Sequence, residues 1–165
     1  MGVRRRTGFV AALAVIGCAA LGGTAGAAPP SNICTLAGLT KTLVAKTFGA
    51  PATTTYVPTD GTNPGRCDMA TAKGGAQLFL YGASSGPTLV TGFERSLSKS
   101  TRAALPSLGK GSVLLHQAAG AGASAATLVL FTKGEYFVAL VAENQYAATS
   151  AQLLTLAHVI HSKVH

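Results

Sequence analysis

The sequence predicts a single α+β domain, an antiparallel sheet of about six strands with three helices packed on it, in the order α-β-β-β-α-β-β-β-α. Short runs rich in β-branched and aromatic residues follow one another with only turn residues between them, as in antiparallel sheets. Three other segments show the apolar spacing of amphipathic helices, which need a sheet face to cover. The chain of 165 residues has room for one domain of ordinary size.

In the first half, a helix is predicted over 41–48, because Thr40 suits the N-cap position and Gly49 and Pro51 end the pattern. Strands are predicted where β-formers lie between Gly, Pro, Asn or Asp, at 53–57, 67–71 and 76–81.

In the second half, Pro87 suits the first turn of a helix that reaches about Lys99. A strand is predicted at 112–116, and the strands 127–131 and 136–141 form a hairpin. The last helix is predicted over 150–163, with one apolar face made of Leu153, Leu156, Ala157, Ile160 and Val164.

The first 27 residues have the pattern of an export signal. Arginines at 4–6 precede an apolar stretch at 9–21, and small residues at 25–27 suit a signal peptidase. We therefore expect a signal peptide at 1–27, a short lead-in at 28–33 and the folded domain at 34–165. No segment is long and apolar enough to span a membrane, which takes about 20 residues. Localisation is expected in the cell envelope or outside the cell.

Cys18 leaves a second fate open for the exported chain. Val15, Ile16 and Gly17 before it fit the lipobox pattern, in which the cysteine is lipidated and becomes the new N-terminus. The apolar run continues to Leu21, whereas a lipoprotein tether is usually polar, and cleavage after Ala27 competes. Free secretion and anchoring to the outer face of the cytoplasmic membrane both remain, and membrane association is expected only if Cys18 is lipidated.

Cys34 and Cys67 are the two cysteines beyond the signal, and an oxidising compartment favours a disulfide between them. In the chain-entropy model such a bridge closes a loop of about 33 residues and stabilises the fold by roughly 3.5–4 kcal/mol. The alternative is two independent buried thiols.

The distribution of charge argues against nucleic acid as a partner and indicates an anionic surface. After removal of the signal, ten Lys and Arg face five Asp and Glu, and the scattered cations make nucleic acid an unexpected partner. Arg95, Lys99 and Arg102 recur at helical spacing with Glu94 as the acid among them. They form a candidate contact for an anionic phospholipid or wall polymer. The alternative is a solvated helix face.

Ser84 lies in a Gly-x-Ser-x-Gly sequence between a predicted strand and a predicted helix, as in the nucleophile elbow of α/β-hydrolases. Glu135, Glu143 and His158 follow in the order of that triad. The strands are arranged as meanders and no oxyanion-hole segment precedes the serine, so the alternative is a connecting Gly/Ser loop. Catalysis is therefore not expected.

Three histidines near the C-terminus, His158, His161 and His165, share neighbouring rows of the last predicted helix. No cysteine or carboxylate lies near them in sequence to complete a metal site, and cations near a helix C-terminus are favoured without a ligand. We expect no metal and no cofactor.

Several short motifs together resemble a class of small exported domains of actinobacteria, many of them lipoproteins. They are the Cys-Thr-Leu-Ala-Gly-Leu-Thr segment at 34–40, the Leu-Pro-Ser-Leu-Gly segment at 105–109 and the Lys-Gly-Glu-Tyr hairpin at 133–136. Leu43 stands where that class has a glutamate, and the opening is two residues longer. The resemblance implies an envelope domain with a disulfide and an α+β fold, and it implies no active site.

These patterns together predict an exported binding module without catalytic activity. Its partner would be an envelope protein or an apolar ligand such as a lipid, held between helices and sheet. The alternative to such a cavity is a filled core. Two other functions remain open: a small serine hydrolase that uses Ser84, and a secreted inhibitor or partner-binding protein.

Overall fold

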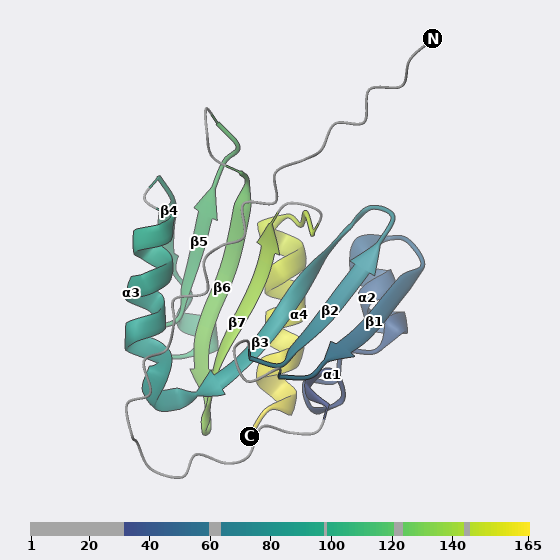
Figure 1. Cartoon of the computed structure of the whole chain (residues 1–165), viewed down its shortest axis with the longest axis horizontal. Helices are drawn as coiled ribbons and strands as arrows, with labels where there is room; N and C mark the ends of the chain where they lie inside the picture. Colours follow the sequence, from purple (N-terminus) through teal and green to yellow (C-terminus); the bar gives the residue numbers. More distant parts are fainter. Residues whose placement is uncertain (1–31, 60–63, 98, 121–123, 144–145) are drawn as a thin grey trace.

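The computed structural model describes residues 32–59, 64–97, 99–120, 124–143 and 146–165. These residues form an antiparallel sheet of seven strands in the order β1-β2-β3-β7-β6-β5-β4, with helices on both faces (Figure 1). The predicted α+β class with an antiparallel sheet is confirmed. The predicted signal peptide, Cys18 and most of the predicted lead-in lie outside the described residues.

The first half of the chain forms two short helices and a three-stranded meander. Its elements are α1 (Ile33–Leu36), α2 (Lys41–Phe48), β1 (Ala52–Val57), β2 (Arg66–Thr71) and β3 (Gly74–Gly82). The Thr40 hydroxyl accepts a hydrogen bond from the Leu43 N–H, as an N-cap does. Gly49 ends α2 in the left-handed region at φ 67°, where glycine has no Cβ penalty.

The second half crosses over to the far edge of the sheet and returns toward its centre. Its elements are η1 (Ala83–Ser85), α3 (Gly86–Ser96), β4 (Thr101–Ala104), η2 (Pro106–Leu108), β5 (Val113–Gln117), β6 (Ala126–Lys133), β7 (Tyr136–Glu143) and α4 (Ser150–Lys163). β7 ends beside β3, so the last strand joins the two meanders into one sheet. Thr149 and Gln152 form a capping box that starts α4 where the sequence predicts it.

The two faces of the sheet are covered differently. On one face, the α4 face, α1, α2 and α4 pack over a buried cluster that includes Met69, Leu78, Leu140 and Leu156. On the other, the α3 face, α3 packs over side chains of β3, β5, β6 and β7. The cluster beneath α3 contains no residue of β1 or β2. No helix of the described residues is long and apolar enough to cross a membrane.

The structure corrects the predicted elements at three places. Thr101–Ala104 forms a strand, β4, that the sequence did not predict, which raises the strand count from about six to seven in the described residues. Ile33–Leu36 forms the short helix α1, so Ile33, assigned to the lead-in, is part of the buried core. Helix α3 ends at Ser96 and does not reach Lys99, because the backbone of Leu97, at φ −103° and ψ 55°, is no longer helical.

Candidate functional site

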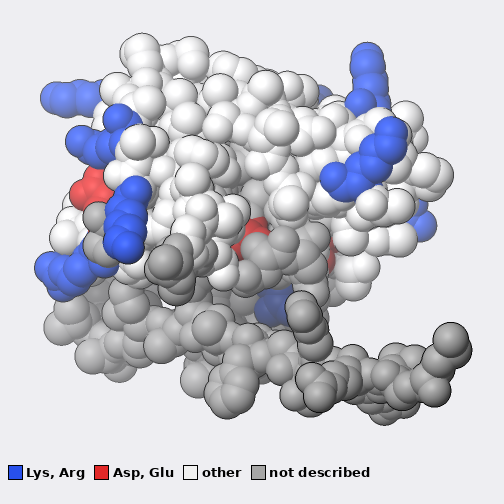
Figure 2. Space-filling view, turned by 90° about the horizontal axis from the view of Figure 1, so that it is seen from above, with Lys and Arg blue, Asp and Glu red and all other residues white. Residues whose placement is uncertain are grey.

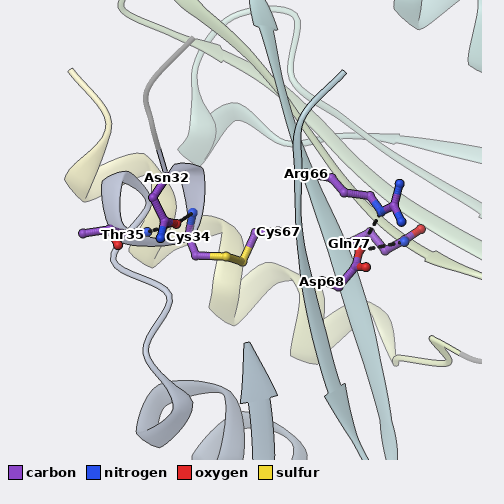
Figure 3. Close-up of a disulfide and its surroundings, with 7 residues drawn as sticks. All are labelled: Asn32, Cys34, Thr35, Arg66, Cys67, Asp68 and Gln77. Carbon is purple, nitrogen blue, oxygen red and sulfur yellow. Dashed lines mark hydrogen bonds and ion pairs between the residues drawn. A yellow bond between two sulfur atoms is a disulfide. The ribbon is translucent and has the colours of Figure 1, made fainter. Parts of the chain in front are cut away.

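The predicted disulfide links the first helix to the sheet. The sulfur atoms of Cys34 and Cys67 lie 2.08 Å apart, in agreement with the predicted pair (Figure 3). Asn32 caps α1 and accepts hydrogen bonds from the backbone N–H groups of Cys34, at 3.0 Å, and Thr35, at 3.3 Å. The cap and the bridge together fix α1 against β2, on the α4 face.

A polar network lies on the α3 face of β2 and β3. Oδ1 of Asp68 accepts hydrogen bonds from Nε of Arg66, at 3.0 Å, and from Nε2 of Gln77, at 2.9 Å (Figure 3). The Asp68 side chain is 16% exposed, and that of Arg66 is 33% exposed. The Asp68 carboxylate thus accepts from two donors. The network holds Arg66 in place over β2, a part of the α3 face that α3 itself does not cover.

Aromatic side chains continue this face toward α3. Phe79 stacks on Tyr81, and Tyr81 lies 6.3 Å from the ring of Phe137. Glu143, at the far end of β7, is half-buried, and burial raises its pKa. The network was not predicted from the sequence. The one signal for it is that residues 66 and 68 alternate with the buried Cys67 and Met69.

Three predicted contact residues, Arg95, Lys99 and Arg102, belong to one end of the molecule, which we call the basic end. All three are exposed, and they come from α3, the α3–β4 connection and β4. The prediction that they share one helix face is wrong, because α3 ends before Lys99 and Arg102 lies on a strand. Figure 2 shows Lys and Arg side chains gathered at the end where α3 and β4 lie, and others at the opposite end.

Glu94 connects the elements of the basic end. Its Oε1 lies 2.9 Å from Nε of Arg102, an ion pair that joins α3 to β4. The atom is buried but makes no well-aligned hydrogen bond, so the contact is mainly electrostatic. The Arg102 side chain remains 58% exposed, which leaves most of its guanidinium open to solvent. Arg95 and Lys99 are in no ion pair among the described residues.

Ser84 lies between β3 and α3, at the strand-to-helix position that the sequence predicts. Glu135 is close to this segment, since its backbone carbonyl accepts a hydrogen bond from the Ala83 N–H at 2.9 Å. Glu143 is not, because Tyr136 pairs with Gly82 and Glu143 lies seven residues farther along β7, at roughly 3.3 Å per residue. His158 lies on α4, which covers the opposite face from α3. The geometry does not assemble the triad considered as the alternative for Ser84.

The three C-terminal histidines do not converge on a common point. No group of three or more metal-binding side chains occurs among the described residues. The His161 ring instead lies 5.7 Å from the ring of Phe131 on β6. Burial, and then the charges of Lys133 and His158, lower the pKa of His161, so its neutral form is favoured in this position.

The space between the sheet and α4 is filled by side chains. Leu78, Leu140, Leu156 and Ile160 are all fully buried there. A groove of about 360 Å³ lies on the surface between α2 and α4, lined by Leu43, Lys46, Thr47, Ala151, Gln152 and Thr155. Four of the six lining residues are polar or charged, but apolar atoms make up most of the lining surface, so the lining does not select between an apolar and a polar ligand.

Comparison with known proteins assigns the chain to no family. No family model matches, and no curated protein sequence is similar. A crystal structure of a GTP-binding regulator from Thermotoga maritima is similar with a TM-score of 0.43 and 8% identity, over 78% of this chain and 93% of that chain. A likeness of this size carries no conclusion about fold or function.

Proposed function

We propose that the chain is an exported binding module, without catalytic activity, whose basic end contacts anionic phosphate groups of the cell envelope. The observation that carries the proposal is the position of Arg95, Lys99 and Arg102. Three exposed cations from separate elements lie together at one end, and within the described part of the chain Glu94 forms an ion pair only with Arg102. The export signal predicted from the sequence supports the location, and the proposal holds for both the secreted and the lipidated form.

The chemistry of these side chains fits phosphate. Arginine presents a planar fork of donors that matches phosphate oxygens, whereas lysine acts as a point charge. Each cation near an anionic membrane surface contributes about 1 kcal/mol, so three of them contribute about 3 kcal/mol, roughly a hundredfold in affinity. Because these residues are exposed, binding costs them little desolvation.

Vesicle binding tests this proposal with a matched control. The test variant replaces Arg95, Lys99 and Arg102 with glutamine, and the control replaces Lys41, Lys46 and Lys73, which are also exposed. Both variants lose three positive charges, but the control residues belong to α2 and the β2–β3 turn, away from β4.

The purified chain is titrated with phosphatidylglycerol vesicles, phosphatidylcholine vesicles and soluble polyphosphate. We expect binding to the two anionic probes, and a loss of about a hundredfold in the test variant but less than about threefold in the control. Binding to vesicles but not to polyphosphate would identify a membrane surface as the source of the phosphate. Equal losses in both variants, or no binding to either anionic probe, would refute the proposal.

A further inference from the structure

The two edges of the sheet differ in the features that protect an edge from pairing. β1 has six residues, Ala-Thr-Thr-Thr-Tyr-Val, with no charge, glycine or proline among them. β4 has four residues and includes Arg102. Short strands and charged side chains are the usual protection of sheet edges. β4 has both, whereas β1 has neither and is bounded only by Pro51 and Pro58.

The register shows which backbone groups of β1 are available. Thr71 and Gly74 are paired residues that close a two-residue turn, and such a turn is closed by a hydrogen-bonded pair. Bonded and non-bonded pairs alternate along antiparallel strands, so every second residue of β2 directs its N–H and C=O toward β1. The residues of β1 that they face are Thr53, Thr55 and Val57. The residues whose N–H and C=O point away from the sheet are Ala52, Thr54 and Tyr56.

We infer that β1 pairs with β1 of a second copy of this chain, antiparallel, about a two-fold axis at Thr54. In this register Thr54 lies opposite Thr54 of the other copy, and Ala52 lies opposite Tyr56. All three outward residues of each copy are then paired within the strand. A slip by two residues in either direction places one of them opposite Ala50 or Pro58, outside the strand.

Side chains support the same register. Thr53 of one copy lies opposite Thr55 of the other on the α3 face, where both side chains are exposed. These positions form non-hydrogen-bonded pairs, in which side chains approach most closely, and cross-strand threonine pairs stabilise a sheet. The two-fold pairing thus builds a threonine ladder across the interface.

The neutral β1 strand is compatible with a second copy as the partner, and the nearest cations, Lys41, Lys46 and Lys73, belong to α2 and the β2–β3 turn and not to the strand. A strand without charge brings no repulsion to a contact with itself, and a two-fold axis makes the contact self-complementary. The basic end lies at the opposite edge, six interstrand spacings away, or roughly 29 Å. The basic ends of two copies are therefore separated by well over the Debye length of about 10 Å.

Sedimentation equilibrium of the purified chain, with its disulfide formed, tests the association. We expect the wild type to reach twice the monomer mass as its concentration rises. Thr54→Pro removes an outward N–H, which an edge strand tolerates, and is expected to remain monomeric. Ala104→Pro makes the same change on β4, because Leu105 donates its N–H to Ser112 and the Ala104 N–H therefore points outward. This control is expected to dimerise like the wild type.

Cysteine cross-linking tests the register and needs no proline variant to fold. In Thr54→Cys the two new cysteines lie opposite each other, about 5.5 Å apart at Cα, within the range of a disulfide. In Ala52→Cys they lie four residues apart along the strand, roughly 13 Å. We expect mild oxidation to cross-link the first variant at least tenfold faster. Equal rates, a wild type that stays monomeric, or a Thr54→Pro variant that dimerises would overturn the inference.

Discussion

The two edges of this sheet present different chemistry to their surroundings. At the β4 edge, all four residues are exposed, and Arg102 stands beside Arg95 and Lys99. At the β1 edge, the strand is longer and neutral, and its outward backbone groups belong to Ala52, Thr54 and Tyr56. Charge makes the first edge suited to an anion and unsuited to strand pairing, and its absence makes the second suited to pairing.

The support behind the two edges also differs. The disulfide, α1 and α2 hold β1 and β2 from the α4 face. β4 is held by its ladder with β5 and by the ion pair between Arg102 and Glu94. The β1 edge is thus backed by a covalent bridge and the β4 edge by an exposed ion pair, which contributes little to stability. This difference predicts how each edge responds to mutation, salt and pH.

The largest effect is expected from loss of the disulfide. A Cys34→Ala, Cys67→Ala double variant should lower the free energy of unfolding by roughly 3.5–4 kcal/mol, because the bridge restricts the unfolded chain. Denaturant unfolding under oxidising conditions measures this change. Amide hydrogen exchange should become faster in α1, β1 and β2. After correction for the lower global stability, the exchange rates in β4 and β5 should equal those of the wild type. Equal increases at both edges would break the comparison between them.

Salt should separate the two kinds of contact. Raising NaCl from about 0.05 M to 0.5 M shortens the Debye length and should weaken binding of the basic end to anionic vesicles by more than about tenfold. Pairing through β1 depends on backbone hydrogen bonds, so dimerisation should not weaken. Vesicle titration and sedimentation at the two salt concentrations provide the measurements. Dissociation of the dimer in high salt would indicate that charged residues, and not β1 backbone groups alone, hold its interface together.

Acid should weaken the middle of the sheet, on which both edges depend. His161 packs against Phe131, and burial, followed by the charges of Lys133 and His158, lowers its pKa from the ordinary 6.5. The unfolded chain therefore binds the proton more readily, and the free energy of unfolding falls as the pH drops from 6.5 toward the lowered value.

Glu143 has the opposite effect on the pH dependence of stability. Burial raises its pKa from 4.5, so the stability that it contributes in acid is lost as the pH rises through the raised value.

Unfolding free energies between about pH 5 and pH 8 test the histidine contribution. His161→Gln should flatten the decline, and the control His116→Gln, on the exposed surface of β5, should retain it. A decline that survives in His161→Gln would assign the acid sensitivity to another group.

The smallest effect on stability is expected from Glu94→Gln. The side chains of the Arg102–Glu94 ion pair are 58% and 37% exposed, so loss of the pair should change the free energy of unfolding by no more than about 0.5–1 kcal/mol. The same change removes the acid of the basic end and should raise its affinity for anionic vesicles a few-fold. Weaker vesicle binding in this variant would mean that the ion pair positions Arg102 for its partner.

Longer elements with a buried face could be predicted from the sequence, whereas β4, which has no buried residue, and the four-residue α1 could not. Strands such as β6 and β7 alternate or run apolar because most of their side chains are buried. β4 has no buried residue, so its Thr-Arg-Ala-Ala sequence carries no periodicity to detect. For the same reason the sequence places Arg102 on a helix face with Arg95 and Lys99, whereas the residue lies on β4. For α1, the signal in the sequence is the capping residue Asn32. A helix of only four residues shows no apolar periodicity that would support this signal.

The candidate sites depend on contacts between elements, which sequence spacing does not determine. Cys34 and Cys67 could be paired because no other cysteine lies beyond the predicted signal. Arg102 and Glu94 meet because the short connection after α3 returns the chain to β4, and Asp68 meets Gln77 through the register of β2 and β3. The Gly-x-Ser-x-Gly motif is found at its expected strand-to-helix position, yet the antiparallel sheet carries Glu143 to the other end of β7.

The central claim is that the two edges differ in function, with β1 pairing with itself and β4 remaining free. Residue-resolved amide exchange of the purified chain, at a low and a high protein concentration, tests it most directly. We predict that the amides of Ala52, Thr54 and Tyr56 become protected at high concentration, while those of Arg102 and Ala104 exchange equally fast at both. Unchanged exchange in β1, or new protection in β4, would contradict this account.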